Sequence, residues 1–160
     1  MPDLFSAREL IEVAIREEAT ASTFYTAAAG NADSKDLKAY LLEVAAMEVE
    51  HERQFRELLK RVGGYQPSGE SYSGEYESYM GYLTEGRIFP MGRDGEEMAR
   101  RQGSDKQVVE TAMEMERNTL LFYHEMIRFV PVNDRPLLED IISEERQHVT
   151  DFAKFKEEHS

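Results

Sequence analysis

Two short motifs in the sequence place an imidazole three residues after a carboxylate: Glu48 with His51, and Glu145 with His148. On a helix, residues three apart project from the same face. Each motif also lies within a row of apolar residues at helical spacing, which predicts that it faces the core of a helical protein. A carboxylate buried alone costs a large amount of free energy. The motifs therefore predict a buried, positively charged partner, and a metal ion is the best candidate.

Two further glutamates, Glu18 and Glu116, stand in apolar rows of their own. A single Glu-x-x-His motif usually marks a solvated pair on a helix surface, so one motif alone would not predict a metal site. The prediction depends on the whole set of four carboxylates and two imidazoles. Its members are Glu18, Glu48, His51, Glu116, Glu145 and His148.

These residues recur along the chain at a nearly constant interval. Glu18 and Tyr25 reappear 98 positions later as Glu116 and Tyr123, whereas Glu48 and His51 reappear 97 positions later as Glu145 and His148. An interval that aligns the polar residues as well as the apolar ones indicates an internal repeat of a helix pair. The sequence thus predicts two equivalent helix pairs, each contributing one glutamate and one Glu-x-x-His motif.

The apolar rows and the capping residues predict an all-α fold, a four-helix bundle built from two repeated helix pairs joined by a long crossover. We expect one domain over residues 1–160. Its helices are predicted at about 4–29, 35–62, 105–129 and 135–156, with a crossover at about 63–104. Short helices are expected in that crossover near 76–83 and 96–102. Its tyrosines are expected to pack the crossover, a subunit contact or one end of the bundle rather than to form a redox chain.

Such a bundle would place the six residues around two cations. Two divalent ions bring four positive charges against four carboxylates, so the buried cluster is close to neutral. Oxygen and imidazole ligands without sulfur suit iron or manganese, and zinc also binds them. Without metal, crowded buried carboxylates are expected to have raised pKa values.

Tyr25 and Tyr123 each lie seven residues after an inward-facing glutamate, two turns along the same face. They either pack the core, with a hydroxyl that finds some partner, or act at the site through a hydrogen bond to a ligand carboxylate or as a residue that meets a radical. The neighbouring acids are interpreted as solvated; these are Glu17, Glu50, Glu52, Glu114 and Glu144. His124 and His159 lack the motif and are interpreted as ordinary histidines.

The composition excludes several classes of function. The formal net charge of −13 argues against nucleic-acid binding. The absence of cysteine excludes thiolate metal sites and a thiol nucleophile. No apolar run reaches membrane-spanning length and no signal peptide is evident, so we expect a cytoplasmic protein.

At these motifs the sequence resembles the rubrerythrin branch of the ferritin-like superfamily. The resemblance rests on Glu18 before Phe24-Tyr25, on Glu116 before Phe122-Tyr123 and on the two Glu-x-x-His motifs, and only the crossover matches poorly. It implies a non-haem di-iron centre held by the six residues named above, with Glu48 and Glu145 as bridging carboxylates. It also implies that Tyr25 forms a hydrogen bond near the centre.

The sequence departs from that family at two points. Rubrerythrin peroxidases usually append a rubredoxin-like domain with four cysteines, whereas this chain has none, so a separate electron-donor protein such as a rubredoxin is expected. They also carry an extra glutamate one turn before the ligand of the third helix, where this sequence has Met113. The site in this respect resembles the symmetric six-ligand centre of bacterioferritin-type proteins.

The resemblance implies a di-iron oxidoreductase that reduces peroxide or dioxygen as Fe(II) is oxidised. Two alternatives stay open: a ferroxidase or iron-storage protein, and a metal-binding bundle without turnover. The sequence stops shortly after the fourth helix, so a homodimer is expected rather than a ferritin-type shell.

Overall fold

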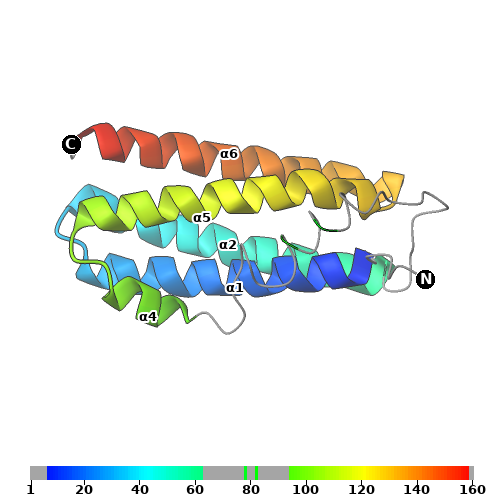
Figure 1. Ribbon diagram of the computed structural model, residues 1–160, viewed down its shortest axis with the longest axis horizontal. Helices are drawn as coiled ribbons and strands as arrows, with labels where there is room; N and C mark the ends of the chain where they lie inside the picture. Colours follow the sequence, from blue (N-terminus) through cyan, green and yellow to red (C-terminus); the bar gives the residue numbers. More distant parts are fainter. Residues whose placement is uncertain (1–6, 63–77, 79–81, 83–93, 159–160) are drawn as a thin grey trace.

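The computed structural model describes residues 7–62, 78, 82 and 94–158. Its four long helices run side by side along the long axis of the molecule (Figure 1). They are α1 (Ala7–Asn31), α2 (Lys35–Val62), α5 (Asp105–Met126) and α6 (Arg135–Glu158). α2 has the bounds expected from the sequence, and the fold is the predicted all-α four-helix bundle. None of the described helices combines the length and the apolar character needed to cross a membrane.

Short connections make the helices of each pair antiparallel. α1 and α2 are joined by residues 32–34, and the hydroxyl of Ser34 caps α2 by accepting a hydrogen bond from the amide of Leu37. The carboxylate of Asp105, at the start of α5, accepts from the amides of Asp33 and Ser34 at 3.0 and 2.8 Å. This contact ties the turn of the first pair to the beginning of the second.

The second connection is more structured than expected. The last residues predicted for the third α-helix form a 3₁₀ turn, η1 (Ile127–Phe129). A second turn, η2 (Val132–Asp134), follows Pro131 and leads into α6. The change of helix type is consistent with Pro131, whose missing N–H and restricted preceding residue oppose continuation of the helix.

One short helix of the crossover is described, α4 (Gly95–Arg100), close to the predicted position. Asp94 caps it by accepting from the amides of Glu96 and Glu97. α4 packs on α1, and a Cβ at Gly95 would lie 2.6 Å from backbone atoms of Phe24 and Thr20. Only glycine therefore permits this close approach. The helix expected near 76–83 falls mostly outside the described residues. Within this range only Ser78 and Tyr82 are described, and both are helical.

Two apolar clusters fill the bundle, one toward each end. The first includes Leu10, Phe55, Phe122, Phe129 and Leu138. The second includes Phe24, Leu37, Leu41, Val109 and Phe152. The polar residues predicted to bind metal belong to neither cluster. The fold thus sets a polar centre between two apolar layers.

Candidate metal centre

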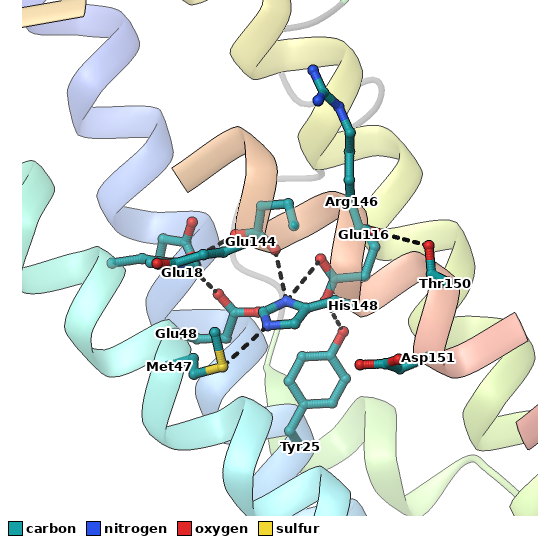
Figure 2. A network of polar contacts seen from close by, with 12 residues as sticks. Glu18, Tyr25, Met47, Glu48, Glu116, Glu144, Arg146, His148, Thr150 and Asp151 are labelled. Atoms are coloured by element: carbon teal, nitrogen blue, oxygen red, sulfur yellow. Dashed lines mark hydrogen bonds and ion pairs between the residues drawn. The ribbon is translucent and has the colours of Figure 1, made fainter. Parts of the chain in front are cut away.

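The four long helices bring together all six residues predicted as metal ligands. α1 supplies Glu18, α2 supplies Glu48 and His51, α5 supplies Glu116, and α6 supplies Glu145 and His148. None of these residues is more than 3% exposed. Figure 2 shows Glu18, Glu48, Glu116 and His148 directed toward one another.

Their ligand atoms form two overlapping groups. One group contains Glu18, Glu48, His51 and Glu145, and the other contains Glu48, Glu116, Glu145 and His148; within each group, the atoms lie within 4.8 Å of one another. Glu48 and Glu145 belong to both groups. The geometry therefore offers two adjacent cation positions, with two carboxylates between them.

The imidazoles point their Nδ1 atoms into this cluster in nearly the same way. His51 Nδ1 lies 3.0 Å from Glu48 Oε2 and 2.9 Å from Glu145 Oε1. His148 Nδ1 lies 2.9 Å from Glu145 Oε2 and 3.3 Å from Glu48 Oε1. Each Nδ1 is also 3.8 Å from the remaining glutamate of its own group, Glu18 or Glu116. The internal repeat of the sequence is thus an approximate two-fold symmetry of the site.

The two tyrosines follow the same symmetry by crossing between helix pairs. The hydroxyl of Tyr25 on α1 donates to Glu116 on α5 (Figure 2). The hydroxyl of Tyr123 on α5 donates to Glu18 on α1. Both rings are fully buried. Each tyrosine therefore holds the orientation of a candidate ligand on the opposite pair, while its ring also packs in the core.

Burial and mutual repulsion favour protons on two of the carboxylates. Burial, followed by the charges of Glu145 and Glu18, raises the pKa of Glu48. Burial and the nearby charge of Glu145 raise the pKa of Glu116 to about 8, although His148 opposes the shift. The expectation of raised pKa values is confirmed for these two residues. Such protons must leave before a cation can bind.

The expectation of a raised pKa is wrong for Glu145. Burial and the charge of Glu18 act to raise its pKa, but the hydrogen bond with His148 and the close approach of His51 Nδ1 outweigh them and lower it. Burial by itself would lower the pKa of both imidazoles, yet the surrounding carboxylates raise it, that of His148 to about 12. Without metal, protonated histidines thus supply the positive charge that the buried carboxylates require.

Two carboxylate oxygens in the centre fit a cation better than a proton donor. Glu48 Oε1 and Glu145 Oε1 are buried without a well-oriented hydrogen bond, even though a histidine nitrogen lies 3.3 and 2.9 Å away, respectively. Buried polar atoms are normally satisfied. The donor set of carboxylate oxygens and imidazole nitrogens is one that divalent iron, manganese and zinc accept. The residues present therefore fit a pair of such ions.

Behind the cluster, the outward-facing nitrogens of the histidines have different partners. His51 Nε2 lies 2.6 Å from Glu144 Oε2, whose side chain is 49% exposed. His148 Nε2 lies 3.4 Å from the sulfur of Met47 (Figure 2). Glu144 and Met47 are 97 positions apart, so they are matching residues of the repeat.

Two of the acids interpreted as solvated, Glu17 and Glu144, are instead buried or in contact with the centre. Glu144 contacts His51, and Glu17 is only 6% exposed, 3.7 Å from the Nε of Arg16. The apolar period of the helices did not indicate either arrangement. In the case of Glu144, the side chain reaches His51 on another helix. Glu50 and Glu114 are exposed, as is His124, and Glu52 is 25% exposed. His159 lies outside the described residues.

Comparison with known proteins places the chain in a family. Residues 9–156 match the sequence profile of the rubrerythrin family. The chain belongs to this family. Family membership and the buried cluster together indicate a di-metal site in this rubrerythrin family member, of the kind found in di-iron proteins.

A solved structure supports the fold independently. A protein of Thermotoga maritima, described as a candidate ferritin-like diiron-carboxylate protein, superposes with a TM-score of 0.75. The match covers 98% of each chain at 20% sequence identity. No curated protein sequence matches this rubrerythrin family member.

Proposed function

We propose that this protein binds two iron ions between its four glutamates and two histidines and uses them to reduce peroxide or dioxygen as Fe(II) is oxidised. The observation that carries the proposal is the double set of four ligand atoms sharing Glu48 and Glu145. When bound, iron supplies Lewis acidity and a source of electrons. Manganese or zinc would fit the same residues, so the metal itself must be measured.

The protein residues would hold and orient such a pair of ions. Glu48 and Glu145 contribute oxygens to both positions, whereas Glu18 and Glu116 each belong to one. Tyr25 and Tyr123 fix these latter two carboxylates through hydrogen bonds. The apolar layers on both sides limit the access of water, which strengthens electrostatic interactions within the centre.

Metal content tests the first part of the proposal. Protein expressed in iron-replete medium is expected to carry close to two irons per chain. Glu48→Ala and His148→Ala should lose iron while the helical content is retained. Metal-free wild-type protein of undiminished stability would instead support a bundle without turnover.

Reactivity tests the second part. The ferrous protein is mixed anaerobically with peroxide in a stopped-flow instrument, and separately with dioxygen, and ferric absorbance is followed. We expect oxidation well above the rate of free Fe(II) under the same conditions. Oxidation no faster than that of free Fe(II) would remove the proposal, and a preference for one oxidant identifies the reaction.

An iron-oxidising or iron-storage role is the second candidate. Two observations favour it. The six residues are arranged symmetrically, and Met113 packs against the apolar cluster that contains Phe24 and Phe152. Rubrerythrin peroxidases have an additional glutamate at the position of Met113.

We propose a homodimeric, cytoplasmic protein that receives electrons from a separate protein such as a rubredoxin. Size-exclusion chromatography separates the candidates, because a particle of several hundred kilodaltons would favour storage.

A further inference from the structure

A row of aromatic rings connects the metal centre with the protein surface. The ring of Tyr25, whose hydroxyl contacts Glu116, stacks on Phe152 at a centroid distance of 5.6 Å. Phe152 meets Tyr40 edge to face at 5.1 Å, and Tyr40 stacks on Phe155 at 5.4 Å. Tyr25 and Phe152 are fully buried, whereas Tyr40 and Phe155 are partly exposed. The row therefore passes without interruption from the interior to solvent.

The surface end of the row pairs a phenol with a proton acceptor. The hydroxyl of Tyr40 donates to Asp151 Oδ2 at 3.2 Å. Burial and the charge of Asp151 raise the pKa of Tyr40 further above neutral pH, at which a phenol already keeps its proton. Both residues line a surface pocket of about 340 Å³ together with Glu43, Lys154, Phe155 and Glu158. A phenol beside a carboxylate can release a proton at the moment it loses an electron.

The other half of the centre has no matching row among the equivalent positions. Tyr123 contacts Phe55 at 5.2 Å, as Tyr25 contacts Phe152. The residues that match Tyr40 and Phe155, 97 positions away, are the aliphatic Leu137 and Leu58, and Asp151 is matched by Gln54. Core packing alone requires neither the hydroxyl nor the carboxylate, since the matching positions pack without them.

We propose that Tyr40 is a redox-active residue that passes electrons between the surface pocket and the metal centre through Phe152 and Tyr25. The inference rests on the proposed function, because the oxidised di-iron centre is the oxidant. Tyr40 loses one electron, its O–H bond breaks, and the proton passes to Asp151 Oδ2. The electron lowers the oxidation state of the centre by one equivalent. One electron from an external donor and return of the proton from Asp151 then restore the phenol.

The absence of cysteine allows a direct test with a photosensitiser at one chosen position. Glu43→Cys places a ruthenium complex at the pocket beside Tyr40, and Asp140→Cys places it at the matching position of the other half, 97 residues away and also exposed. The iron-loaded ferrous protein is flashed anaerobically with an electron acceptor present, so that Ru(III) forms. Ru(III) gains one electron, Fe(II) loses one, and absorbance reports both ferric iron and any tyrosyl radical.

We expect the label at position 43 to oxidise the centre roughly tenfold faster than the label at position 140. A tyrosyl signal should precede the ferric signal only from position 43. Adding Tyr40→Phe, which keeps the ring contacts and removes the hydroxyl, should abolish that signal and slow the reaction to the rate seen from position 140. Equal rates from the two labels, or an unchanged rate with Tyr40→Phe, would overturn the proposal.

A second measurement examines Tyr40 without the centre. In metal-free protein labelled at position 43, the flash should still generate the tyrosyl radical, and Asp151→Asn should slow its formation. No radical here, or one insensitive to Asp151→Asn, also overturns the proposal. Peroxide and dioxygen take no part in either measurement. A failure of the proposed reaction with these oxidants is therefore separate from a failure of the electron route.

Discussion

The two helix pairs bring matching residues to the centre but place different residues behind them. On the first pair, His51 is backed by the carboxylate of Glu144 at 2.6 Å. On the second, His148 faces the thioether of Met47 at 3.4 Å. Toward the centre, both rings make almost the same contacts. The repeat has thus kept what the charge balance of a di-metal cluster requires and has changed what lies outside it.

This difference makes the two cation positions inequivalent. A carboxylate behind a histidine ligand orients the ring, fixes its tautomer and increases its basicity toward a metal. A thioether sulfur is only a weak acceptor. The position next to His51 is therefore expected to bind a cation more tightly than the one next to His148.

The largest predicted effect separates shared from unshared carboxylates. Glu145→Gln removes a ligand charge from both groups, so both ions should be lost. Glu18→Gln removes a charge from one group only and should leave one ion bound. Metal analysis of the purified variants checks this, with circular dichroism to verify the fold. A Glu145→Gln protein that retains one ion would show that the two positions do not share this carboxylate.

The second prediction concerns the residues behind the histidines. Glu144→Gln should weaken the tighter binding step by about 10–100-fold. Met47→Glu should strengthen the weaker step and bring the two affinities together. Competition titration of metal-free protein with Zn²⁺ measures both steps without redox chemistry. Met47→Leu is the matched control and should change little.

Two equal steps in the wild-type protein would argue against this comparison. So would a Glu144→Gln variant with unchanged binding, because the 2.6 Å contact would then have no influence on the ligand.

Much of this centre could be predicted from the sequence, because the helical period determines the face of the helix from which each side chain projects. Glu48 and His51 lie in one apolar row, and a row of that length sets the buried face of α2 with little freedom. The repeat then supplied the partner helices. The predicted bundle and the convergence of the six residues followed from these two regularities.

What was missed depends on distances between helices, which a period within one helix does not report. Glu144 is adjacent to Glu145 and lies off the apolar row, yet it reaches His51 on α2. Glu17 is only 6% exposed, on a helix that contacts α2, α4 and α5, and the apolar period of α1 alone does not indicate this burial. The pairing of Tyr40 with Asp151 is likewise a contact between α2 and α6 that neither helix indicates alone.

The third prediction uses the protons that occupy the centre when metal is absent. The pKa of Glu116 is raised from 4.5 to about 8, so its stabilising contribution is complete below pH 4.5 and is lost as the pH rises toward 8. The pKa of His148 is raised from 6.5 to about 12, so its contribution is complete below pH 6.5 and declines as the pH rises above it. Both changes have the same sign.

Metal-free protein should therefore melt at progressively lower temperature from about pH 5 to about pH 9. Zn²⁺ displaces these protons, so the loaded protein should show a weaker dependence, and its affinity for metal should rise with pH. Thermal unfolding followed by circular dichroism measures both series. Glu116→Gln, which cannot titrate, should flatten the metal-free curve, and a melting temperature that rises over this range would contradict the assignment of protons.

The smallest predicted effect tests the two halves where their structures agree. Tyr25→Phe and Tyr123→Phe each remove one buried hydrogen bond to a carboxyl group and keep the ring. Each should lower the free energy of unfolding of the metal-free protein by about 0.5–1.5 kcal/mol. For a chain of this size, such a loss lowers the melting temperature by only a few degrees. Tyr40→Phe, at a partly exposed hydroxyl, is the control and should cost less.

Similar losses at positions 25 and 123 would show that the symmetry extends to energetics, so that the inequivalence of the two ions arises from the residues behind the histidines. A severalfold difference would locate an asymmetry inside the centre itself.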